Sequence, residues 1–381
     1  MDFELSEDLT MLRDMAREFA ENELVPRATK HDREETIDPA VIAHMGELGL
    51  MGLTIPEDFG GSGMGNLALS IVLEEINRGC ASTGVTLSVH NSLVGAPLKR
   101  FGTPEQQQQW LPKLATGEVM GAYCLTEAGA GSDAAALATT AVKDGDEWVL
   151  NGTKLFVTNG AWAGLFVVYA RSNPEVSKAK GISAFLVPKD APGLSVGKKE
   201  KKSGIRGSST TEIILENCRI PAGNLIGQEG KGFNLAMDTL DGGRIGIAAQ
   251  ALGVGRACLE ASVKYAGERE QFGKPIGAFQ AIQWKLADMS ARLDAARLKV
   301  WKAAWLRDAG QKCTQAAAEA KLLASTTANF CADECLQIHG GAGYTDDFHV
   351  ERLFRDARIT EIYEGATDIQ RLVIARNLLT A

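Results

Sequence analysis

The chain has 381 residues and a net charge of −8, with 45% hydrophobic and 23% charged residues, as is typical of a globular protein with a large buried core. The negative charge argues against nucleic acid as the main partner, because phosphate binding needs a basic face. The acidic N-terminus has no apolar signal-peptide core, and the longest charge-free run, residues 79–98, is too polar to span a bilayer. We therefore expect a cytoplasmic protein of about two or three domains without membrane insertion.

The cysteines and histidines do not form a metal-binding pattern. The seven cysteines are odd in number and scattered, which fits reduced thiols in a cytosol-like compartment. Cys331 and Cys335 are one helical turn apart, but no second Cys or His pair accompanies them. The sequence therefore predicts no metal site. It also lacks a Walker phosphate loop and a complete Gly-x-Gly-x-x-Gly fingerprint, so a dinucleotide would have to be held in another way.

Residues 1–117 are predicted to form an all-α domain. Ser6 can cap a first helix, whose apolar positions recur every three or four residues until Pro26 ends it. The Pro- and Gly-rich stretch at residues 54–63 is predicted to be a loop. Further helices are expected at residues 39–48, 67–78 and 82–101, and a last one begins at Pro104, where proline suits the first helical position.

Residues 118–226 are predicted to form a β-barrel or β-sandwich domain, because short apolar runs alternate with turns of Gly, Asn, Asp and Pro. Asp144-Gly145-Asp146 and Asn151-Gly152 are typical of hairpin turns. The lysine-rich run at residues 198–202 is expected to be a solvated loop. The predicted strands are residues 121–125, 138–143, 147–150, 154–158, 165–171, 182–188 and 212–218.

Residues 227–381 are predicted to form a four-helix bundle. Apolar residues advance by three and four from Phe279 to Ala303 along one long helix, which is the pattern of a bundle seam. The other helices are expected at residues 232–268, 316–339 and 367–379, the last one closing the set. Several glycines weaken the first of these helices locally and would let a neighbour or ligand come close. The predicted fold class is therefore α+β with three domains.

One acidic residue stands in an unusual context just before the last predicted helix. Glu364 lies between Tyr363 and Gly365 and follows the apolar residues Ile359 and Ile362. A partly desolvated carboxylate has a raised pKa and can act as a general base near neutral pH. The alternative is that Glu364 only caps the helix that begins near Thr367.

Two glycine-rich turns follow predicted elements. Residues 123–133 leave the first predicted strand and would present backbone N–H groups and small hydroxyls, which suit the polar edge of a flavin or the carbonyls of an acyl-pantetheine. Residues 337–344 end a long predicted helix, where a glycine pair is an expected stop. Taken alone, each turn is equally consistent with ordinary structure.

Taken together, four segments resemble the acyl-CoA dehydrogenases over essentially the whole chain. They are Tyr-Cys-Leu-Thr-Glu-x-Gly-Ala-Gly-Ser-Asp from residue 123, Glu-Arg-Glu-Gln-Phe-Gly-Lys-Pro-Ile from residue 268, Gln-Ile-His-Gly-Gly-x-Gly-Tyr from residue 337, and Ile-Tyr-Glu-Gly-x-x-x-Ile-Gln-Arg from residue 362. The resemblance implies an FAD-dependent enzyme that converts an acyl-CoA to the trans-2-enoyl-CoA and passes electrons to electron-transferring flavoprotein. It also implies a homotetramer, a dimer of dimers, in which a neighbouring subunit supplies part of the FAD site.

The resemblance assigns roles residue by residue. Glu364 matches the base that removes the α-proton while the β-hydrogen leaves as hydride to flavin N5, and the backbone N–H of the same residue helps to polarise the thioester carbonyl. The positions that match flavin-lining residues are Tyr123, Leu125, Thr126, Ser132, Phe156, Val157 and Thr158. Those expected to hold the diphosphate and adenine from a neighbouring subunit are Arg269, Gln271, Phe272, Gln280, Gln337, Ile338, His339, Gly340 and Gly341. Ala366, Thr367 and Asp368 complete the cofactor set, and the substrate-side positions are Ser132, Asp241, Arg244, Tyr363 and Gly365.

Three positions qualify these assignments. Ala128 stands where most relatives have Pro, which changes loop rigidity more than chemistry, and Ala366 stands where Thr is usual, so one hydroxyl contact to the cofactor is missing. For Arg244 the alternative to a substrate contact is a salt bridge inside the bundle.

The resemblance also indicates the branch of the family. Gly243 matches the position where one branch carries its base, which leaves Glu364 as the base here. Residues 240–246 resemble the butyryl-CoA type most closely, and Gly84 stands where glutaryl-CoA dehydrogenases carry an Arg, which argues against a dicarboxylyl substrate. The alternatives are a branched-short-chain acyl-CoA dehydrogenase, an acyl-CoA oxidase, and a non-catalytic relative that binds acyl-CoA.

Overall fold

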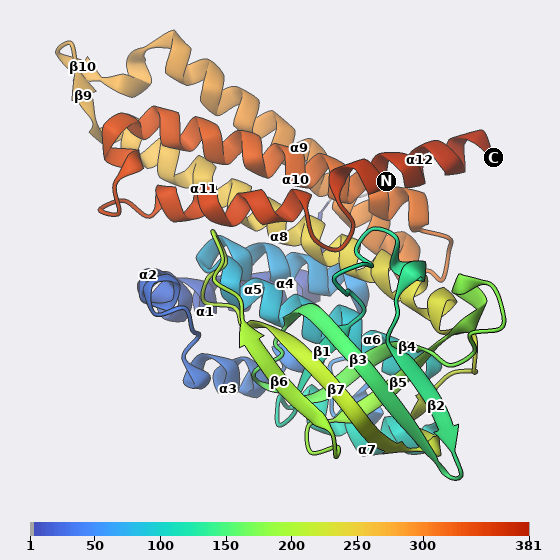
Figure 1. The fold of residues 1–381 in the computed structure, drawn as a ribbon. Helices are drawn as coiled ribbons and strands as arrows, with labels where there is room; N and C mark the ends of the chain where they lie inside the picture. The colour runs from blue at the N-terminus through green and yellow to red at the C-terminus, as the bar shows by residue number, and fades with distance from the viewer. Residues whose placement is uncertain (1–3, 381) are drawn as a thin grey trace.

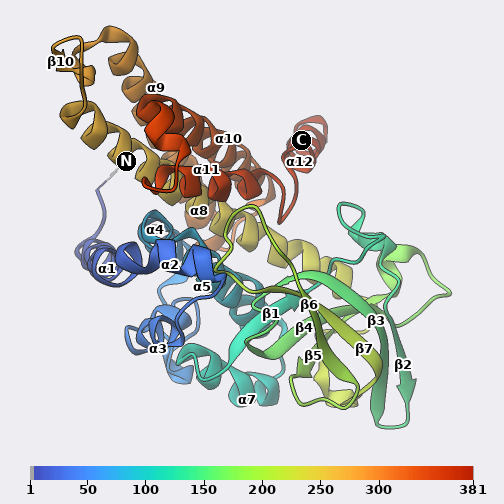
Figure 2. The same cartoon turned by 60° about the vertical axis from the view of Figure 1, so that its left-hand side comes forward.

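The computed structural model describes residues 4–380 (Figure 1). A bundle of C-terminal helices lies above the N-terminal helices and the β-sheet in both views (Figures 1 and 2). The longest helix, α8 (Gly232–Glu268), begins beside the sheet and runs to the far end of the bundle. Among the described residues, no helix combines the length and the apolar composition needed to cross a membrane.

The N-terminal part is helical, as predicted, but Pro26 does not end the first helical run. A π-helical turn, η1, follows α1, and Pro26 lies in the first turn of α2, where its missing N–H and its ring are tolerated. A capping box between Thr103 and Gln106 fixes the start of the last helix of this part. The elements are α1 (Glu7–Phe19), η1 (Ala20–Leu24), α2 (Val25–Glu34), α3 (Pro39–Glu47), η2 (Leu50–Gly52), η3 (Glu57–Phe59), α4 (Gly65–Gly79) and α7 (Pro104–Ala115).

The helix predicted at residues 82–101 is interrupted. It consists of α5 (Ala81–Ser88), the π-helical segment η4 (Val89–Gly95) and α6 (Ala96–Phe101). Every residue of α5 and η4 is buried, and η4 packs against both α8 and the first strand. Such π-helical turns are often found at functional sites.

The middle part is a sheet in the order β6-β7-β3-β2-β4-β5-β8, with β1 paired parallel to β4. Asn151-Gly152 is not a hairpin turn: β3 runs through it and continues its pairing with β7 after a register shift, as a β-bulge allows. The lysine run is only partly a loop, because Lys198 and Lys199 belong to β6, which the sequence did not predict. The strands are β1 (Met120–Cys124), β2 (Thr140–Asp144), β3 (Glu147–Thr158), β4 (Ala163–Arg171), β5 (Ile182–Pro188), β6 (Leu194–Lys199), β7 (Thr210–Pro221) and β8 (Leu225–Ile226).

Strand β4 is buried on both faces. Leu165, Val167 and Tyr169 pack toward the helices, whereas Phe166 and Val168 pack into the apolar core on the other face of the sheet. This alternation explains why the strand reads as a continuous apolar run.

The C-terminal bundle has the predicted apolar seam on α9, but the helices that form the bundle differ from those predicted. The sequence did not predict α11 (Val350–Arg358), which packs against α8 and α10, while α12 (Thr367–Leu379) packs on α10 and buries only Gln370. The last helix therefore does not close the bundle. The remaining elements are α9 (Gln280–Asp308), α10 (Thr314–His339), and a hairpin of β9 (Glu270–Gln271) and β10 (Lys274–Pro275) between α8 and α9.

Candidate active site

Glu364 lies in the segment between α11 and α12, with its side chain turned into the protein. Its Oε2 atom is buried and has no hydrogen-bond partner among the described residues. The N-cap of α12 is Ala366, and no side chain caps this helix. The helix-cap interpretation of Glu364 is therefore wrong, and its carboxylate has no structural partner that would explain its burial.

The carboxylate rests against α8 at a glycine. A Cβ atom on Gly243 would lie 2.2 Å from Oε2 of Glu364 and 2.8 Å from Cδ2 of Leu93, so only glycine leaves room for the carboxylate here. Leu93 belongs to the π-helical segment η4. The surroundings of Glu364 therefore combine a bare stretch of helix with an apolar side chain.

A buried lysine holds the backbone on both sides of Glu364. Lys321 of α10 has no exposed surface, and its Nζ donates hydrogen bonds to the carbonyl oxygens of Tyr363 at 2.8 Å and Gly365 at 2.5 Å. Gln370 of α12 donates a second hydrogen bond to Gly365 O at 2.7 Å. Glu364 and Gly365 both have positive φ, 49° and 97°, so the chain turns sharply between these contacts.

Arg244 and Asp241 form a buried ion pair on α8. Arg244 Nη1 donates to Asp241 Oδ1 at 2.7 Å, and Asp241 Oδ2 accepts a hydrogen bond from Thr314 at 2.6 Å. The alternative predicted for Arg244, a salt bridge inside the bundle, is thus present. The Nε atom of Arg244 remains buried without a partner, and it approaches Gly365.

Two tyrosines border the same region. The hydroxyl of Tyr363 donates to Gln250 Oε1 on α8, and Gln250 in turn donates to Ala81 O at 3.3 Å. Tyr123, at the end of β1, packs on Tyr169 with ring centroids 5.1 Å apart, and its hydroxyl is buried without a partner. Electrostatic interaction with Glu364 contributes to raising the pKa of both Tyr123 and Tyr363.

The electrostatic environment suits proton transfer at Glu364. Burial raises the pKa of Glu364 to about 7, while Lys321 and Arg244 act in the opposite direction. A carboxyl group with this pKa is divided between its protonated and ionised forms near neutrality, as a general base requires.

The other predicted residues of the middle part surround the end of β1. Leu125 and Val157 are buried, Thr126 and Thr158 are half-buried, and Ser132 is exposed. Phe156 has a positive φ of 56° and 62% of its surface is exposed.

A buried ion pair fixes the loop that follows β1. Lys154 Nζ lies 2.6 Å from Glu127 Oε1 and donates to Leu125 O at 3.3 Å. The Glu127 carboxylate also accepts the backbone N–H groups of Ala138 at 2.6 Å and Thr139 at 3.0 Å. The loop is therefore tied down at both ends, with Ser132 at its exposed middle.

The remaining predicted cofactor residues are gathered at the opposite end of the bundle. The β9–β10 hairpin lies at the far tip of the molecule from β1 and the loop after it (Figures 1 and 2). His339 belongs to this end, since it stacks on Tyr265 with ring centroids 4.2 Å apart. Arg269 is exposed and forms no ion pair with a described residue, and Phe272 is 94% exposed. Gln271, Gln280, Gln337, Gly340 and Gly341 are exposed, and Ile338 and His339 are buried. One chain therefore does not bring the two groups of predicted cofactor residues together.

The structure also shows the contacts of Thr367, Asp368 and Gly84, which the sequence analysis singled out. Thr367 donates to Glu361 O at 3.0 Å, and Asp368 pairs with Arg371 at 2.8 Å on the surface. A Cβ on Gly84 would lie within 2.2 Å of the Asn77 side chain of α4, so an arginine there would displace Asn77. The described contacts of Gly84 are with α4 rather than with Glu364.

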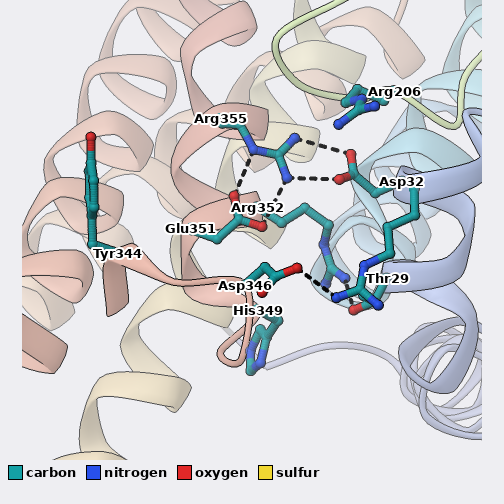
Figure 3. A pocket seen from close by; sticks show the side chains of 10 residues that line it. Thr29, Asp32, Arg206, Tyr344, Asp346, His349, Glu351, Arg352 and Arg355 are labelled. Carbon is teal, nitrogen blue, oxygen red and sulfur yellow. Dashed lines mark hydrogen bonds and ion pairs between the residues drawn. The ribbon is translucent and has the colours of Figure 1, made fainter. Parts of the chain in front are cut away.

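A separate pocket of about 270 Å³ lies between α2 and α11 (Figure 3). Its charges largely satisfy one another: Arg355 bridges Asp32 and Glu351, and Arg33 pairs with Asp346 at 2.9 Å. These ion pairs join the N-terminal helices to the bundle. None of the predicted site residues lines this pocket.

Lys321, Gln250 and Leu93 were not among the predicted site residues. Lys321 carries a readable signal, since it replaces an apolar residue in the buried series Ala317, Lys321, Ala324, Ala328. A lysine at such a seam position must have a buried partner. Gln250 and Leu93 have no comparable signal, because both lie within uniformly buried helical runs.

Models of the acyl-CoA dehydrogenase N-terminal, middle and C-terminal domains match residues 6–118, 122–218 and 230–379. The short-chain specific acyl-CoA dehydrogenase of Rattus norvegicus mitochondria is 52% identical over 376 residues, 99% of this chain and 91% of the relative.

Butyryl-CoA dehydrogenase from Megasphaera elsdenii superposes with a TM-score of 0.97 at 42% identity, with both chains covered fully. A chain in the structure described as the electron transferring flavoprotein of Acidaminococcus fermentans superposes with a TM-score of 0.99 at 47% identity, again with both chains covered fully. A glutaryl-CoA dehydrogenase from Mycobacterium smegmatis, solved in complex with FADH2, is 31% identical with a TM-score of 0.93, covering 99% of this chain and 96% of that one. The chain therefore belongs to the acyl-CoA dehydrogenases, which are flavin-dependent oxidoreductases with FAD as cofactor.

Proposed function

We propose that this chain oxidises a short-chain acyl-CoA to its trans-2-enoyl-CoA and that Glu364 is the catalytic base. The observation that carries the proposal is the buried Oε2 atom of Glu364, which has no hydrogen-bond partner among the described residues and rests against a helix position without a side chain. A structural carboxylate would be paired at this depth. A base waiting for a proton from substrate needs a free oxygen facing the reacting carbon.

The residues around Glu364 support proton removal from the α-carbon of a thioester. The Glu364 carboxylate accepts the α-proton, and its pKa of about 7 lets it hold that proton at neutral pH. Its backbone N–H donates to the thioester carbonyl and stabilises the negative charge that develops there. When bound, FAD supplies the acceptor for the hydrogen that leaves the β-carbon.

The residues present fit an FAD molecule if two chains contribute. The buried, unpartnered hydroxyl of Tyr123, which interacts electrostatically with Glu364, suits the polar edge of a flavin, and the exposed ring of Phe156 suits its face. Arg269, exposed and without an ion-pair partner in the described chain, suits a diphosphate. Arg269 follows the last residue of α8 and precedes β9, and the β9–β10 hairpin lies at the other end of the bundle. We therefore infer that Arg269 serves the site of a second copy, in a homotetramer built as a dimer of dimers.

We also propose that electron-transferring flavoprotein is the electron acceptor. The support is the similarity to a chain in the structure described as that of electron transferring flavoprotein from Acidaminococcus fermentans. Mixing the butyryl-CoA-reduced enzyme with such a flavoprotein should return the flavin absorbance within the turnover time. Reoxidation by dissolved oxygen at the same rate would indicate an acyl-CoA oxidase instead.

Chain-length preference follows from the packing near the base. Leu93 approaches the Glu364 carboxylate across Gly243, so its side chain limits the space there. We expect the highest kcat/KM for saturated acyl-CoAs of about four to six carbons, because an unfillable methylene changes binding by about 1–3 kcal/mol.

The test is a panel of acyl-CoAs assayed by anaerobic bleaching of the flavin. Butyryl-CoA should bleach the yellow protein, and Leu93→Ala should move the preference toward longer chains. An optimum at twelve or more carbons, or faster turnover of isovaleryl-CoA, would contradict the short-chain assignment. A protein that binds acyl-CoA without any bleaching would be a non-catalytic relative.

A further inference from the structure

We propose that Lys321 of α10 is a positioning residue for Glu364, which holds the two backbone carbonyls that flank the carboxylate and places a positive charge close to it. The inference rests on the proposed role of Glu364 as the base. It concerns a residue that neither touches the reacting atoms nor belongs to the predicted site.

The contacts of Lys321 are unusual for a buried lysine. The side chain has no exposed surface, yet no described carboxylate lies within ion-pair distance of its Nζ. Its partners are the carbonyl oxygens of Tyr363 at 2.8 Å and Gly365 at 2.5 Å. A fully buried ammonium group is costly unless it is paired, so these two carbonyls must hold it in place of a carboxylate.

The two hydrogen bonds define the backbone on which Glu364 sits. A positive φ of 49° is uncommon for a glutamate, because its Cβ crowds the backbone in this left-handed conformation. The turn brings the carbonyls before and after Glu364 toward one ammonium group. Removing that group would take away the hydrogen bond to Tyr363 O and leave Gly365 O with only the one from Gln370. The turn would then hold the carboxylate less firmly against Gly243.

The same ammonium group also dominates the local charge balance. Glu364 is faced by Lys321 from α10, Arg244 from α8, Tyr123 from β1, and Tyr363 beside it. Arg244 is neutralised by Asp241 at 2.7 Å, and the tyrosines are uncharged because their pKa values are raised well above the ordinary value. Burial lowers the pKa of Lys321 to about 8, so the group stays largely protonated at pH 7.

The expected consequence is a shift in the pH dependence of the base. Lys321 opposes the rise in the pKa of Glu364 that burial causes. Replacing Lys321 with a neutral side chain should therefore raise that pKa further, by about one unit if the loss matches a typical nearby charge. At low substrate concentration, the pH profile of the flavin-bleaching rate reports the pKa of the base in the free enzyme. The acidic limb of this profile should move to higher pH by the same amount.

The experiment compares Lys321→Gln and Lys321→Met with Lys202→Met in the FAD-loaded enzyme. Lys202 is a matched control, since its Nζ also donates to a backbone carbonyl, Ser208 O at 2.8 Å, and burial also lowers its pKa to about 8. The glutamine side chain in Lys321→Gln would retain a donor for one carbonyl without the charge. A second measurement does not depend on turnover. The intensity of the infrared band of the protonated Glu364 carboxyl group is followed as a function of pH, and Glu364→Gln, which lacks this band, serves as the blank.

We expect both Lys321 variants to shift the acidic limb and the infrared titration upward by about one pH unit, with Lys202→Met unchanged. Slower bleaching with an unshifted limb and an unshifted infrared titration would overturn the proposal and leave Lys321 a purely structural residue. If Lys321→Met loses FAD, the infrared titration of Lys321→Gln decides. If Glu364→Gln still bleaches at nearly the wild-type rate, the assignment of the base fails, whereas the infrared comparison still tests the coupling of Lys321 to Glu364.

Discussion

At the scale of single residues, the features that suit Glu364 to the proposed role of base also reduce stability. Its Oε2 atom is buried without a hydrogen-bond partner among the described residues, which is unfavourable for a charged group. The protein compensates partly with Lys321 and Arg244, and the pKa settles at about 7. The same burial that suits Glu364 to proton transfer must therefore reduce folding stability when the group is ionised.

The kinetic prediction concerns Glu364→Gln, which keeps the size of the side chain but removes the proton acceptor. Flavin reduction by butyryl-CoA should slow by at least ~10²-fold, the lower end expected for loss of general-base catalysis, while FAD and acyl-CoA still bind. Anaerobic stopped-flow spectroscopy measures the rate. Bleaching within a few-fold of the wild-type rate would show that another group is the base.

The stability prediction concerns the same substitution. The folded-state pKa of Glu364, about 7, lies above the ordinary value of 4.5. The contribution of Glu364 to the free energy of unfolding is therefore largest below pH 4.5 and is lost as pH rises through 7. Glutamine resembles the protonated form, so at pH 8 Glu364→Gln should be more stable than wild type by up to about 3 kcal/mol. Thermal unfolding at pH 8 and pH 4 measures the difference, which should disappear at the lower pH. A loss of stability at pH 8 would contradict the burial argument.

At the scale of elements, the β9–β10 hairpin and the residue before it expose an aromatic ring and an arginine to solvent. Phe272 is 94% exposed at a positive φ of 54°, and Arg269 stands beside it without an ion-pair partner in the described chain. Exposed aromatic and arginine side chains on a short rigid turn are typical of a binding surface.

The corresponding prediction is that Arg269→Ala weakens FAD binding while leaving the monomer fold intact. The substitution removes a charge-assisted partner of the diphosphate, worth about 1.5–3 kcal/mol, so the dissociation constant should rise by roughly ten-fold or more. Fluorescence titration of the FAD-free protein with FAD measures the change. Exposed Lys312 offers a control of like charge, since Lys312→Ala should bind FAD as wild type does.

Sequence periodicity predicted the long helices correctly. The predictions that rested on single residues, a helix end at Pro26 and a hairpin turn at Asn151-Gly152, were wrong. The seam on α9 is present, because buried Met289, Leu293 and Ala296 follow the helical repeat. Pro26 was misread since a proline in the first turn of a helix breaks nothing. Asn151-Gly152 was misread because a bulge accommodates this dipeptide inside a strand.

Other parts of the site could not be predicted because they depend on contacts between distant segments. The short, highly charged α11 is stabilised by pairs such as Arg355 with Asp32, which joins residues far apart in the sequence. The burial of Glu364 was open from sequence alone, and its contact with Gly243 joins α8 to the segment before α12. The sequence does show Lys321 as a lysine within a buried series, but it does not show its partners, because these are backbone carbonyls that no side-chain pattern reveals.

At the scale of the whole molecule, the isolated chain leaves apolar side chains uncovered on its bundle. Trp284 and Trp305 of α9 are 64% and 55% exposed, and Leu379 of α12 is 86% exposed. Large apolar side chains in such positions are typical of surfaces that other chains cover. They support the proposed association of copies through the bundle.

The prediction is a homotetramer in solution, with FAD retained only in assembled protein. Sedimentation velocity with detection at the protein and flavin wavelengths measures both properties together. The flavin signal should travel with the tetramer, or with a dimer at low concentration. A monomer that keeps stoichiometric FAD would contradict the shared site.

The distance between Arg269 and Glu364 has a genetic consequence. In the proposed dimer, each site takes Glu364 from one chain and Arg269 from its neighbour. A gene carrying Glu364→Gln and a gene carrying Arg269→Ala would then each encode a chain with a defect in every site of its own homodimer. When the two are co-expressed, a mixed dimer contains one site with both residues intact and one site with both replaced. Two defective alleles should thus complement each other, and an allele with both substitutions on one chain should rescue neither.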